Sequence, residues 1–524
     1  TYKYVRIVQG GYTMRKLFAL MMSCIIVFSV GCSSNAGGDQ VAPNGTANEP
    51  VSGGIVRTTM PSEPDNLDPY LSAASDTDAV MNNVFEGLMR FDENGEILPQ
   101  LATSYTISDD SLTYTFDIRT DVTFHNGDPM TIEDVLYSYK TLAGLNGGEI
   151  LSSKFKLVKA IEKVDEDTLT FTLSEPSSAF LSTLVEPVVP ADYTQQSTAP
   201  VGTGPFTFNS YVPGQKIVLD RNDTYYDTNR MAKIDQIEFR IMTDENSILM
   251  ALKSGDLDIA QVLSMSVPAL EKDFNITSFP QNMVQIFALN LDKKPFDDVR
   301  VRQAINYAID KDLIIEGVVG GYGTKLYTNA SPVMSFWYND LSQNEPYPYD
   351  VEKAKALLAE AGYKDGFETT IKVPSNYQTH VDTAQVLADM LSQVGITLNI
   401  ELIEWGQWLE TVYTGGNYDT TLVGLSGKLE PHEVFLRYES TYPKNFYHLR
   451  SPEYDAILEQ AITETDAPKR AALYKQAQQF LADEAVAVYI MDPHLILASK
   501  PNLKGYTPYP APYFDATKLF YVGE

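Results

Sequence analysis

The stretch HVDTAQVLADMLSQVGITLNIEL, residues 380–402, decides the fold class. Residues 380–394 place apolar side chains three and four positions apart, which predicts an amphipathic helix that ends at Gly395. Residues 396–402 then alternate between apolar and polar side chains, which predicts a strand. A helix that leads into a strand through so short a turn is typical of an αβ unit, so we expect parallel strand pairing here.

The rest of the chain mixes the same two patterns. Alternating apolar residues predict strands at residues 113–118 and 168–173. Three-and-four spacing with turn signals at the ends predicts helices at residues 131–142, 351–361 and 467–482. The mixture predicts an α/β architecture, and no internal repeat of solenoid length is present.

Length and charge narrow the class of protein. A chain of 524 residues is too long for one hydrophobic core, so two or more domains are expected. The net charge of -30 repels nucleic acids and anionic membrane surfaces and favours a soluble monomer. Nucleic acid is therefore excluded as a partner.

The sequence offers little for catalysis. Its two cysteines, Cys24 and Cys32, both lie near the N-terminus, so the body of the chain has no thiol for disulfides or nucleophilic chemistry. The sequence lacks Gly-x-Ser-x-Gly, His-Glu-x-x-His and nucleotide-binding motifs. Catalysis by a pair of carboxylates is the one enzymatic mechanism that so acidic a chain leaves open. We expect a protein that is not an enzyme and needs no cofactor.

Residues 14–31 have the pattern of an export signal. Two basic residues follow Met14, and a mostly apolar run occupies residues 17–30. The run is shorter than the about 20 residues of a membrane span, which makes a retained transmembrane helix the weaker alternative. The pair Gly31-Cys32 resembles bacterial lipoprotein signals, which implies a lipid on Cys32. Ordinary cleavage nearby stays open, because Ser29 departs from the aliphatic residue of that pattern.

Two further segments flank this signal. We interpret residues 1–13 as an upstream extension before a translation start at Met14. Residues 32–54 are rich in Gly, Asn, Ala and Pro, and they carry too few large apolar side chains to form a core. They predict a flexible tether, so the folded body would be held outside the membrane by the lipid.

Specific blocks of sequence occur in a fixed order through the folded part. They are PDNLDP (64–69), VFEGLM (84–89), LPQLA (98–102), LTYTFDIR (112–119), VTFHNGDP (122–129), EDVLYS (133–138), GTGPF (202–206), LDRN (219–222), FDDVRVRQAINYAI (296–309), YDVEKA (349–354) and LLAEAG (357–362). Together they resemble the bacterial extracellular solute-binding proteins of family 5, the oligopeptide, dipeptide and nickel type. The lone His125 among them is interpreted as a structural turn residue.

The resemblance implies a two-lobe α/β fold of the periplasmic-binding-protein type (type II, cluster C), in which a hinge lets the lobes close on a solute. Lobe I would comprise residues 55–80, 198–270 and 485–524, with an extra small domain at 81–197. Lobe II would comprise residues 271–484.

The resemblance also implies a function. The chain would be the substrate-binding subunit of an ABC importer, capturing peptides or peptide-like solutes outside the membrane for a permease and its ATPase subunits. Carriage of an anionic metal chelate, such as a nickel complex, and a sensor role without transport stay open.

Family members that bind peptides carry a Gly-Trp-x-x-Asp loop in the second lobe, whose Asp holds the ligand ammonium group. The matching segment here contains Gly424, Leu425, Ser426, Gly427 and Lys428. The backbone of this loop would pair with an extended ligand. A cation in place of the Asp repels a free N-terminus, so we expect a blocked, acidic or short peptide-like ligand. The alternative is that Lys428 simply pairs with Glu430 or Glu433.

Other candidate ligand residues depend on the fold. Trp405 and Trp408 follow a predicted strand, and aromatic side chains are favoured in binding sites, although core positions are equally open to them. Tyr70 follows a turn that approaches the cleft in the family, and Asn290 follows the strand at 285–289. These four residues complete the aromatic and polar candidates.

A metal site is the weakest of the site predictions. His432, Tyr447 and His448 could contribute imidazole and hydroxyl groups near one another, and imidazole is a common metal ligand. The sequence contains only five histidines, and no pair of them has a tight metal-site spacing. His432 and Tyr447 are therefore included as ligand candidates, while His432 and His448 are weak metal candidates.

Overall fold

The computed structural model of the protein describes residues 50–72 and 74–523. The predicted extension, export signal and lipidation site at Cys32 lie outside the described residues. Residues 50–54, the end of the predicted tether, are hydrogen-bonded to the folded body. Strand β1 (Pro50–Val51) pairs with β21 (Phe520–Val522), and the Gly53 N–H donates to the Lys233 carbonyl oxygen at 2.7 Å. Within the described residues, none of the helices combines the length and apolar character that a membrane crossing requires.

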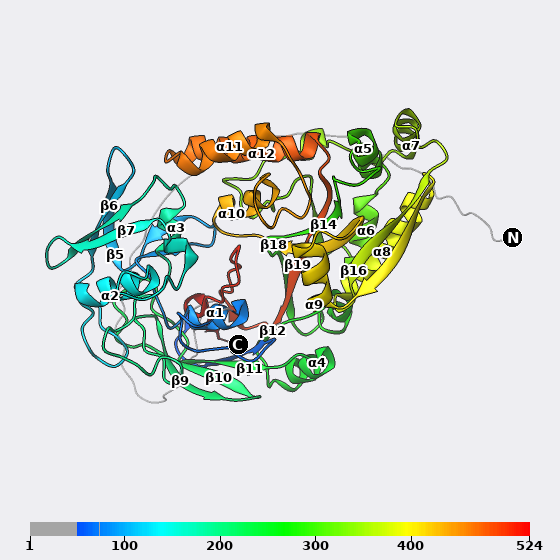
Figure 1. Ribbon diagram of the computed structural model, residues 1–524. Helices are drawn as coiled ribbons and strands as arrows, with labels where there is room; N and C mark the ends of the chain where they lie inside the picture. Colours follow the sequence, from blue (N-terminus) through cyan, green and yellow to red (C-terminus); the bar gives the residue numbers. More distant parts are fainter. Residues whose placement is uncertain (1–49, 73, 524) are drawn as a thin grey trace, which may run out of the picture. The chain divides into compact units, whose positions relative to one another are not determined.

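The structure is mixed α/β, as predicted (Figure 1). The strands are β1 Pro50–Val51, β2 Ile55–Met60, β3 Met89–Phe91, β4 Ile97–Pro99, β5 Ala102–Ile107, β6 Thr113–Ile118, β7 Val158–Lys163, β8 Thr168–Leu173, β9 Phe206–Val212, β10 Lys216–Arg221, β11 Gln236–Ile241, β12 Ile259–Gln261, β13 Asn275–Pro280, β14 Met283–Leu289, β15 Gly323–Lys325, β16 Phe367–Pro374, β17 Ile396–Ile403, β18 Thr420–Ser426, β19 Ala487–Ser499, β20 Leu503–Lys504 and β21 Phe520–Val522.

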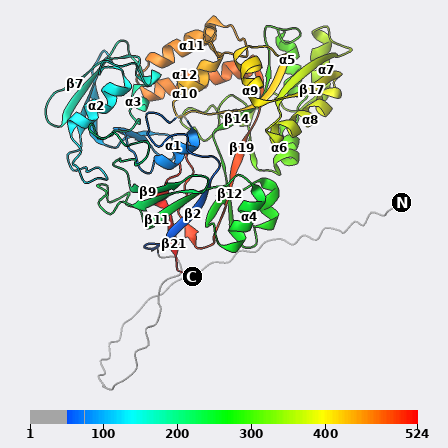
Figure 2. The ribbon, with the colours of Figure 1, turned by 60° about the horizontal axis from the view of Figure 1, so that its bottom comes forward.

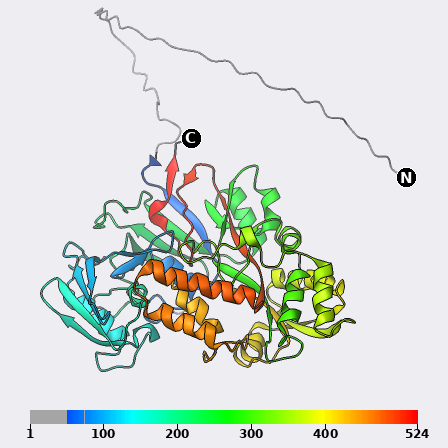
Figure 3. The ribbon, with the colours of Figure 1, turned by 90° about the horizontal axis from the view of Figure 1, so that it is seen from above.

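Helices connect and cover these strands. The α-helices are α1 Ser75–Met81, α2 Ile132–Leu142, α3 Phe180–Thr183, α4 Glu245–Ser254, α5 Val299–Tyr307, α6 Lys311–Val319, α7 Val351–Glu360, α8 Gln378–Ser392, α9 Trp405–Trp408, α10 Pro431–Phe435, α11 Pro452–Thr463 and α12 Ala467–Asp483. Single turns of other helix types are η1 Ser153–Phe155, η2 Ser264–Ala269, η3 Ser342–Asn344, η4 Leu409–Thr414, η5 Leu436–Tyr438 and η6 Ala516–Lys518. The long helices α11 and α12 lie side by side (Figure 3).

Two four-stranded sheets contain most of the N-terminal strands. The first has the order β5-β6-β8-β7, is antiparallel throughout and packs against α2. Helix α2 begins where expected, because the Asp134 carboxylate accepts the Thr131 backbone N–H at 2.8 Å. The second sheet has the order β2-β11-β10-β9 and joins residues 55–60 in parallel to residues 236–241.

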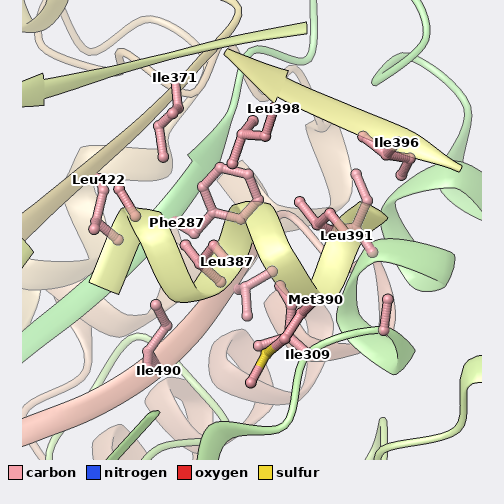
Figure 4. Close-up of a cluster of buried hydrophobic side chains, with 14 of the residues drawn as sticks. Phe287, Ile309, Ile371, Leu387, Met390, Leu391, Ile396, Leu398, Leu422 and Ile490 are labelled. Atoms are coloured by element: carbon pink, nitrogen blue, oxygen red, sulfur yellow. The ribbon is translucent and has the colours of Figure 1, made fainter. Parts of the chain in front are cut away.

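The largest sheet carries the C-terminal half of the chain in the order β12-β19-β14-β18-β16-β17, with β13 and β15 also paired to β19. Strands β16 and β17 run parallel and α8 connects them, so the αβ unit predicted from residues 380–402 is confirmed. The apolar face of α8 explains this packing (Figure 4): Leu387 and Leu391 lie against Phe287 and the sheet residue Leu398.

Strand β19 links distant parts of the fold. Its first half pairs with β14 and β15, and its second half pairs with β12 and β13 (Figure 2). Strand β14 in turn pairs with β18 over the whole length of β18. The strand that holds the predicted ligand loop is therefore supported by the most extensively paired part of the molecule.

Candidate ligand-binding site

Strand β18 has one paired edge and one mostly open edge. It pairs with β14 from Thr420 to Ser426, but its pairing with β16 is limited to Thr420 and Thr421. The Gly424 N–H donates to His380 Nε2 at 3.0 Å, on the side away from β14. Because alternate residues of an antiparallel ladder direct their backbone groups the same way, Ser426 also faces away from β14.

Two glycines permit the close packing of this segment. A Cβ on Gly424 would lie 2.8 Å from the sulfur of Met283 and 3.3 Å from His380 Cε1. A Cβ on Gly427 would overlap the side-chain carboxamide of Asn282. The backbone carbonyl of Asn282 accepts the Gly427 N–H at 2.5 Å. The absence of a side chain at these positions is thus explained by contacts within the protein.

A pocket lies at the end of β18. Its walls are mostly apolar, with polar and charged side chains among them: Asn282, Val284, Asn329, Ala330, Met334, Trp337, Leu425, Gly427, Lys428, Pro431, Val434, Phe435 and Arg437. Three of the residues predicted from the loop, Leu425, Gly427 and Lys428, therefore line one hollow. Mostly apolar walls with a few placed polar groups are typical of a small-molecule site, whereas the volume of about 20 Å³ holds about one water molecule in this form of the protein.

Lys428 is exposed at this pocket and forms no ion pair within residues 50–72 and 74–523. The alternative of pairing with Glu430 does not hold in this structure, because Glu430 is paired with Arg470 of α12. Arg437 also lines the pocket, and its Nη2 donates to the Ser426 carbonyl at 2.9 Å. Neither of these two side chains forms an ion pair with a carboxylate among the described residues.

Glu430 and Arg470 are both almost fully buried beside the loop. Burial raises the pKa of the Glu430 carboxyl, and the Arg470 guanidinium opposes that shift. Arg470 also lies over the rings of Trp337 and Tyr474 and donates to the Ser178 carbonyl at 3.4 Å. This pair therefore holds the loop in place and is not available to a ligand.

The two predicted aromatic residues occupy different positions. Trp408 is 1% exposed, and its Nε1 donates to Thr421 Oγ1 at 2.9 Å, which makes it a core residue. Trp405 is half-buried, stacks on Trp408 with ring centroids 5.1 Å apart, and meets Tyr377 edge to face. Neither tryptophan is among the residues that line the pocket.

Tyr70 and Asn290 are also outside that pocket. The Tyr70 hydroxyl donates to the Pro187 carbonyl at 2.7 Å. Asn290 is 2% exposed and donates from Nδ2 to the carbonyls of Tyr418 at 2.9 Å and Gly416 at 3.2 Å. Both side chains thus bind backbone carbonyls from distant segments of the chain.

The three residues of the metal hypothesis are not brought together as a metal site. His432 Nδ1 lies 3.1 Å from the Tyr474 hydroxyl, and burial, with the charge of Arg470, lowers the pKa of His432 to about 4. Tyr447 is fully buried and hydrogen-bonds to Tyr438, while His448 Nδ1 lies 3.4 Å from the Asp292 carboxylate. No group of three or more His, Cys, Asp or Glu side chains is placed to hold a metal in the described part of the chain.

Comparison with known proteins identifies the family. The model of the bacterial extracellular solute-binding proteins, family 5 (middle region), matches residues 96–446. Di/tripeptide-binding protein 1 of Pseudomonas aeruginosa is 31% identical over 464 residues, which cover 80% of this chain and 86% of that protein. The chain belongs to family 5 of the bacterial extracellular solute-binding proteins.

Solved structures agree with this family-5 assignment. The Helicobacter pylori protein DppA, in complex with the peptide STSA, is 27% identical with a TM-score of 0.72 and covers 90% of this chain and 99% of its own. AgaA from A. tumefaciens R10, in complex with agropinic acid, is also 27% identical, with a TM-score of 0.70 over 90% of this chain and 99% of that chain. The predicted two-lobe periplasmic-binding-protein fold is confirmed.

Several pocket residues of this family-5 protein were not found from the sequence. Asn282, Asn329, Met334 and Trp337 line the pocket but lie in connecting segments without a helix or strand periodicity that would orient them, and Arg437 lies in the short 3₁₀ helix η5. Trp337 is not among the ligand candidates predicted from the sequence, because its connecting segment gives no indication of its position. Long-range packing alone brings these residues to the loop.

Proposed function

We propose that this family-5 protein is the capture subunit of an ABC importer for peptide-like solutes that carry a negative charge. The observation that supports this most directly is the end of β18, where an open strand edge meets a pocket with the unpaired cation Lys428. The relative from P. aeruginosa, named as a di/tripeptide-binding protein, supports a peptide-like ligand. A permease and ATPase subunits would be its partners.

The open edge suits main-chain pairing with an extended ligand. On that edge the Gly424 N–H is bonded to His380 and the Ser426 carbonyl to Arg437. The Gly424 carbonyl and the Ser426 N–H lie on the same edge between these two bonds. We propose that these two backbone groups form hydrogen bonds with the ligand. The proposal thus retains the predicted role of the loop in ligand binding, which includes Gly424, Leu425, Ser426 and Gly427.

The charge of the ligand follows from Lys428 and Arg437. The protein has 69 acidic and 39 basic residues, yet these two cations form no ion pair within residues 50–72 and 74–523, which favours an anionic group at the pocket. A free ammonium group would be repelled at the same position. The relative AgaA, whose solved complex contains agropinic acid, supports an acidic ligand.

The protein would bind this solute without transforming it. Its family consists of binding proteins, and we propose that ATP is consumed only by the partner subunits. We further propose that a lipid on Cys32 anchors the chain outside the membrane and that it acts as a monomer. The other ligand contacts predicted from the sequence are proposed only for a conformation of the site that differs from the one in this structure. They are His432, Tyr447, Trp405, Trp408, Tyr70 and Asn290.

Thermal stabilisation of the purified protein tests the ligand class, because a ligand that binds the folded form raises the unfolding midpoint. The panel contains free di- to hexapeptides, N-acetylated peptides, N-acetylglutamine, acidic amino-acid conjugates and nickel chelates. We expect shifts with the blocked or acidic compounds. Stabilisation by free-amine peptides alone would overturn the charge argument, and a shift confined to nickel chelates would favour the metal-chelate alternative.

A further inference from the structure

Asn329 carries a buried carboxamide that has no hydrogen-bond partner in the part of the chain that the structure describes. It lies after β15 and is 2% exposed, and neither its Oδ1 nor its Nδ2 has a hydrogen-bond partner among the described residues. A buried carboxamide that forms no hydrogen bond destabilises the fold, so Asn329 calls for a partner that is not part of the chain, either a water molecule or a ligand.

The backbone on either side of Asn329 is held firmly. The Ala330 N–H donates to Thr328 Oγ1 at 3.2 Å, and Thr328 Oγ1 donates to Gln478 Oε1 at 3.1 Å. The Val333 N–H donates to Ser331 Oγ at 3.3 Å. These bonds fix the backbone that carries the Asn329 side chain.

The Asn329 side chain lines the pocket at the end of β18. The same pocket is lined by Val284 and Met334, which have no hydrogen-bonding group to offer, and by Trp337, whose indole N–H forms no bond to Asn329 among the described residues. Lys428 and Arg437 line the same pocket. A ligand seated here therefore meets one carboxamide that needs both a donor and an acceptor, together with two cations that need an anion.

We infer that Asn329 is a specificity-determining residue for a ligand that presents an N–H and a C=O side by side, next to a carboxylate held by Lys428 and Arg437. Two chemical groups have this arrangement. The N–H and C=O of one extended peptide residue face the same way, as in an antiparallel ladder, and a primary carboxamide carries both groups on one carbon. This inference rests on the proposed function and names the neutral part of the ligand.

The first test needs no ligand. Asn329→Leu replaces an unpartnered amide by an apolar group of similar size, so the unfolding temperature of the ligand-free protein should stay the same or rise. Asn290→Leu is the matched control, because Asn290 is equally buried at 2% exposed but has its carboxamide fully bonded. The control variant should unfold at a lower temperature. An equal fall in both variants would overturn the inference.

The second test measures binding by calorimetry. The probes are N-acetyl-trialanine, its analogue with the central amide replaced by an ester, and N-acetylglutamine. We expect wild type to bind one of the amide probes about tenfold or more tightly than Asn329→Leu. If wild type prefers N-acetyl-trialanine over its ester and the variant does not, Asn329 binds the N–H and C=O of a peptide residue. If the variant instead loses binding of N-acetylglutamine, Asn329 binds a primary carboxamide.

The two proposals fail in different ways. If wild type binds a probe and Asn329→Leu binds it equally well, the role of Asn329 is wrong and the proposed function stands. If wild type binds no member of the panel and none of these probes, the proposed ligand class is wrong and the inference falls with it.

Discussion

A buried polar cluster and the polar groups of the pocket at the end of β18 differ in how well their hydrogen bonds and charges are satisfied. In the first, Glu86 accepts hydrogen bonds from Gln100, from Tyr225 at 2.5 Å and from Thr203 at 2.9 Å, and Arg230 lies 3.7 Å away. In the pocket at the end of β18, Asn329 has no partner and Lys428 forms no ion pair within the described ranges. The first cluster supports the fold, whereas the second leaves polar groups available to a ligand.

The largest effect on stability is expected from breaking the satisfied cluster. Glu86→Ala leaves Arg230 and several buried donors without their acceptor, which should cost about 3–5 kcal/mol of unfolding free energy. Urea denaturation of the variant measures this loss. Glu86→Gln keeps the shape of the side chain and should lose less. A Glu86→Ala protein as stable as wild type would contradict the comparison.

A pH effect is expected next to the same cluster. His125 Nε2 hydrogen-bonds to the Gly204 carbonyl at 2.9 Å, and burial lowers the pKa of His125 to about 4 from 6.5. As the pH falls below 6.5, the unfolded chain takes up this proton first, so stability is lost between pH 6.5 and about 4. The loss for this one group reaches about 3 kcal/mol.

Unfolding at several pH values checks this effect. His125→Gln should show a weaker dependence of stability on pH between 4 and 6.5 than wild type does. His380 and His432 have pKa values lowered to about 4 as well, so some dependence remains in the variant. Identical pH dependence in the two proteins would show that His125 does not contribute.

The smallest effect on stability, with a clear effect on binding, is expected at Lys428. Because its side chain is exposed and has no ion pair in the part of the chain that is described, Lys428→Ala should leave the unfolding midpoint within error. Affinity for an anionic ligand should fall about tenfold to a hundredfold, the range of a lost charge-assisted hydrogen bond. Calorimetric titration with the best acidic compound of the panel measures it.

Lys444→Ala is the matched control, since Lys444 is another exposed lysine and does not line the pocket. It should change neither stability nor affinity. Equal affinities for Lys428→Ala and Lys444→Ala would mean that Lys428 is only a solvated charge, and the difference drawn between the two clusters would then rest on Asn329 alone.

The sequence by itself determined the local structure. Helix α8, the parallel pair β16 and β17, and strands β6 and β8 follow from periodicity and from stop signals such as Gly395. These features depend on residues close together in the chain, so neighbouring side chains suffice to specify them. The family motifs added the two-lobe fold and the loop that contains Lys428.

Only the tertiary structure decided which side chains serve the pocket. Of the three tryptophans, Trp408 is in the core and Trp337 lines the pocket, although the sequence favoured the former. Lys428 forms no ion pair in the described part of the chain, and Glu430 is instead paired with Arg470, which lies forty residues beyond Glu430 in the sequence. Such outcomes depend on contacts between distant segments, and on which polar group is buried with a partner, neither of which a local pattern contains.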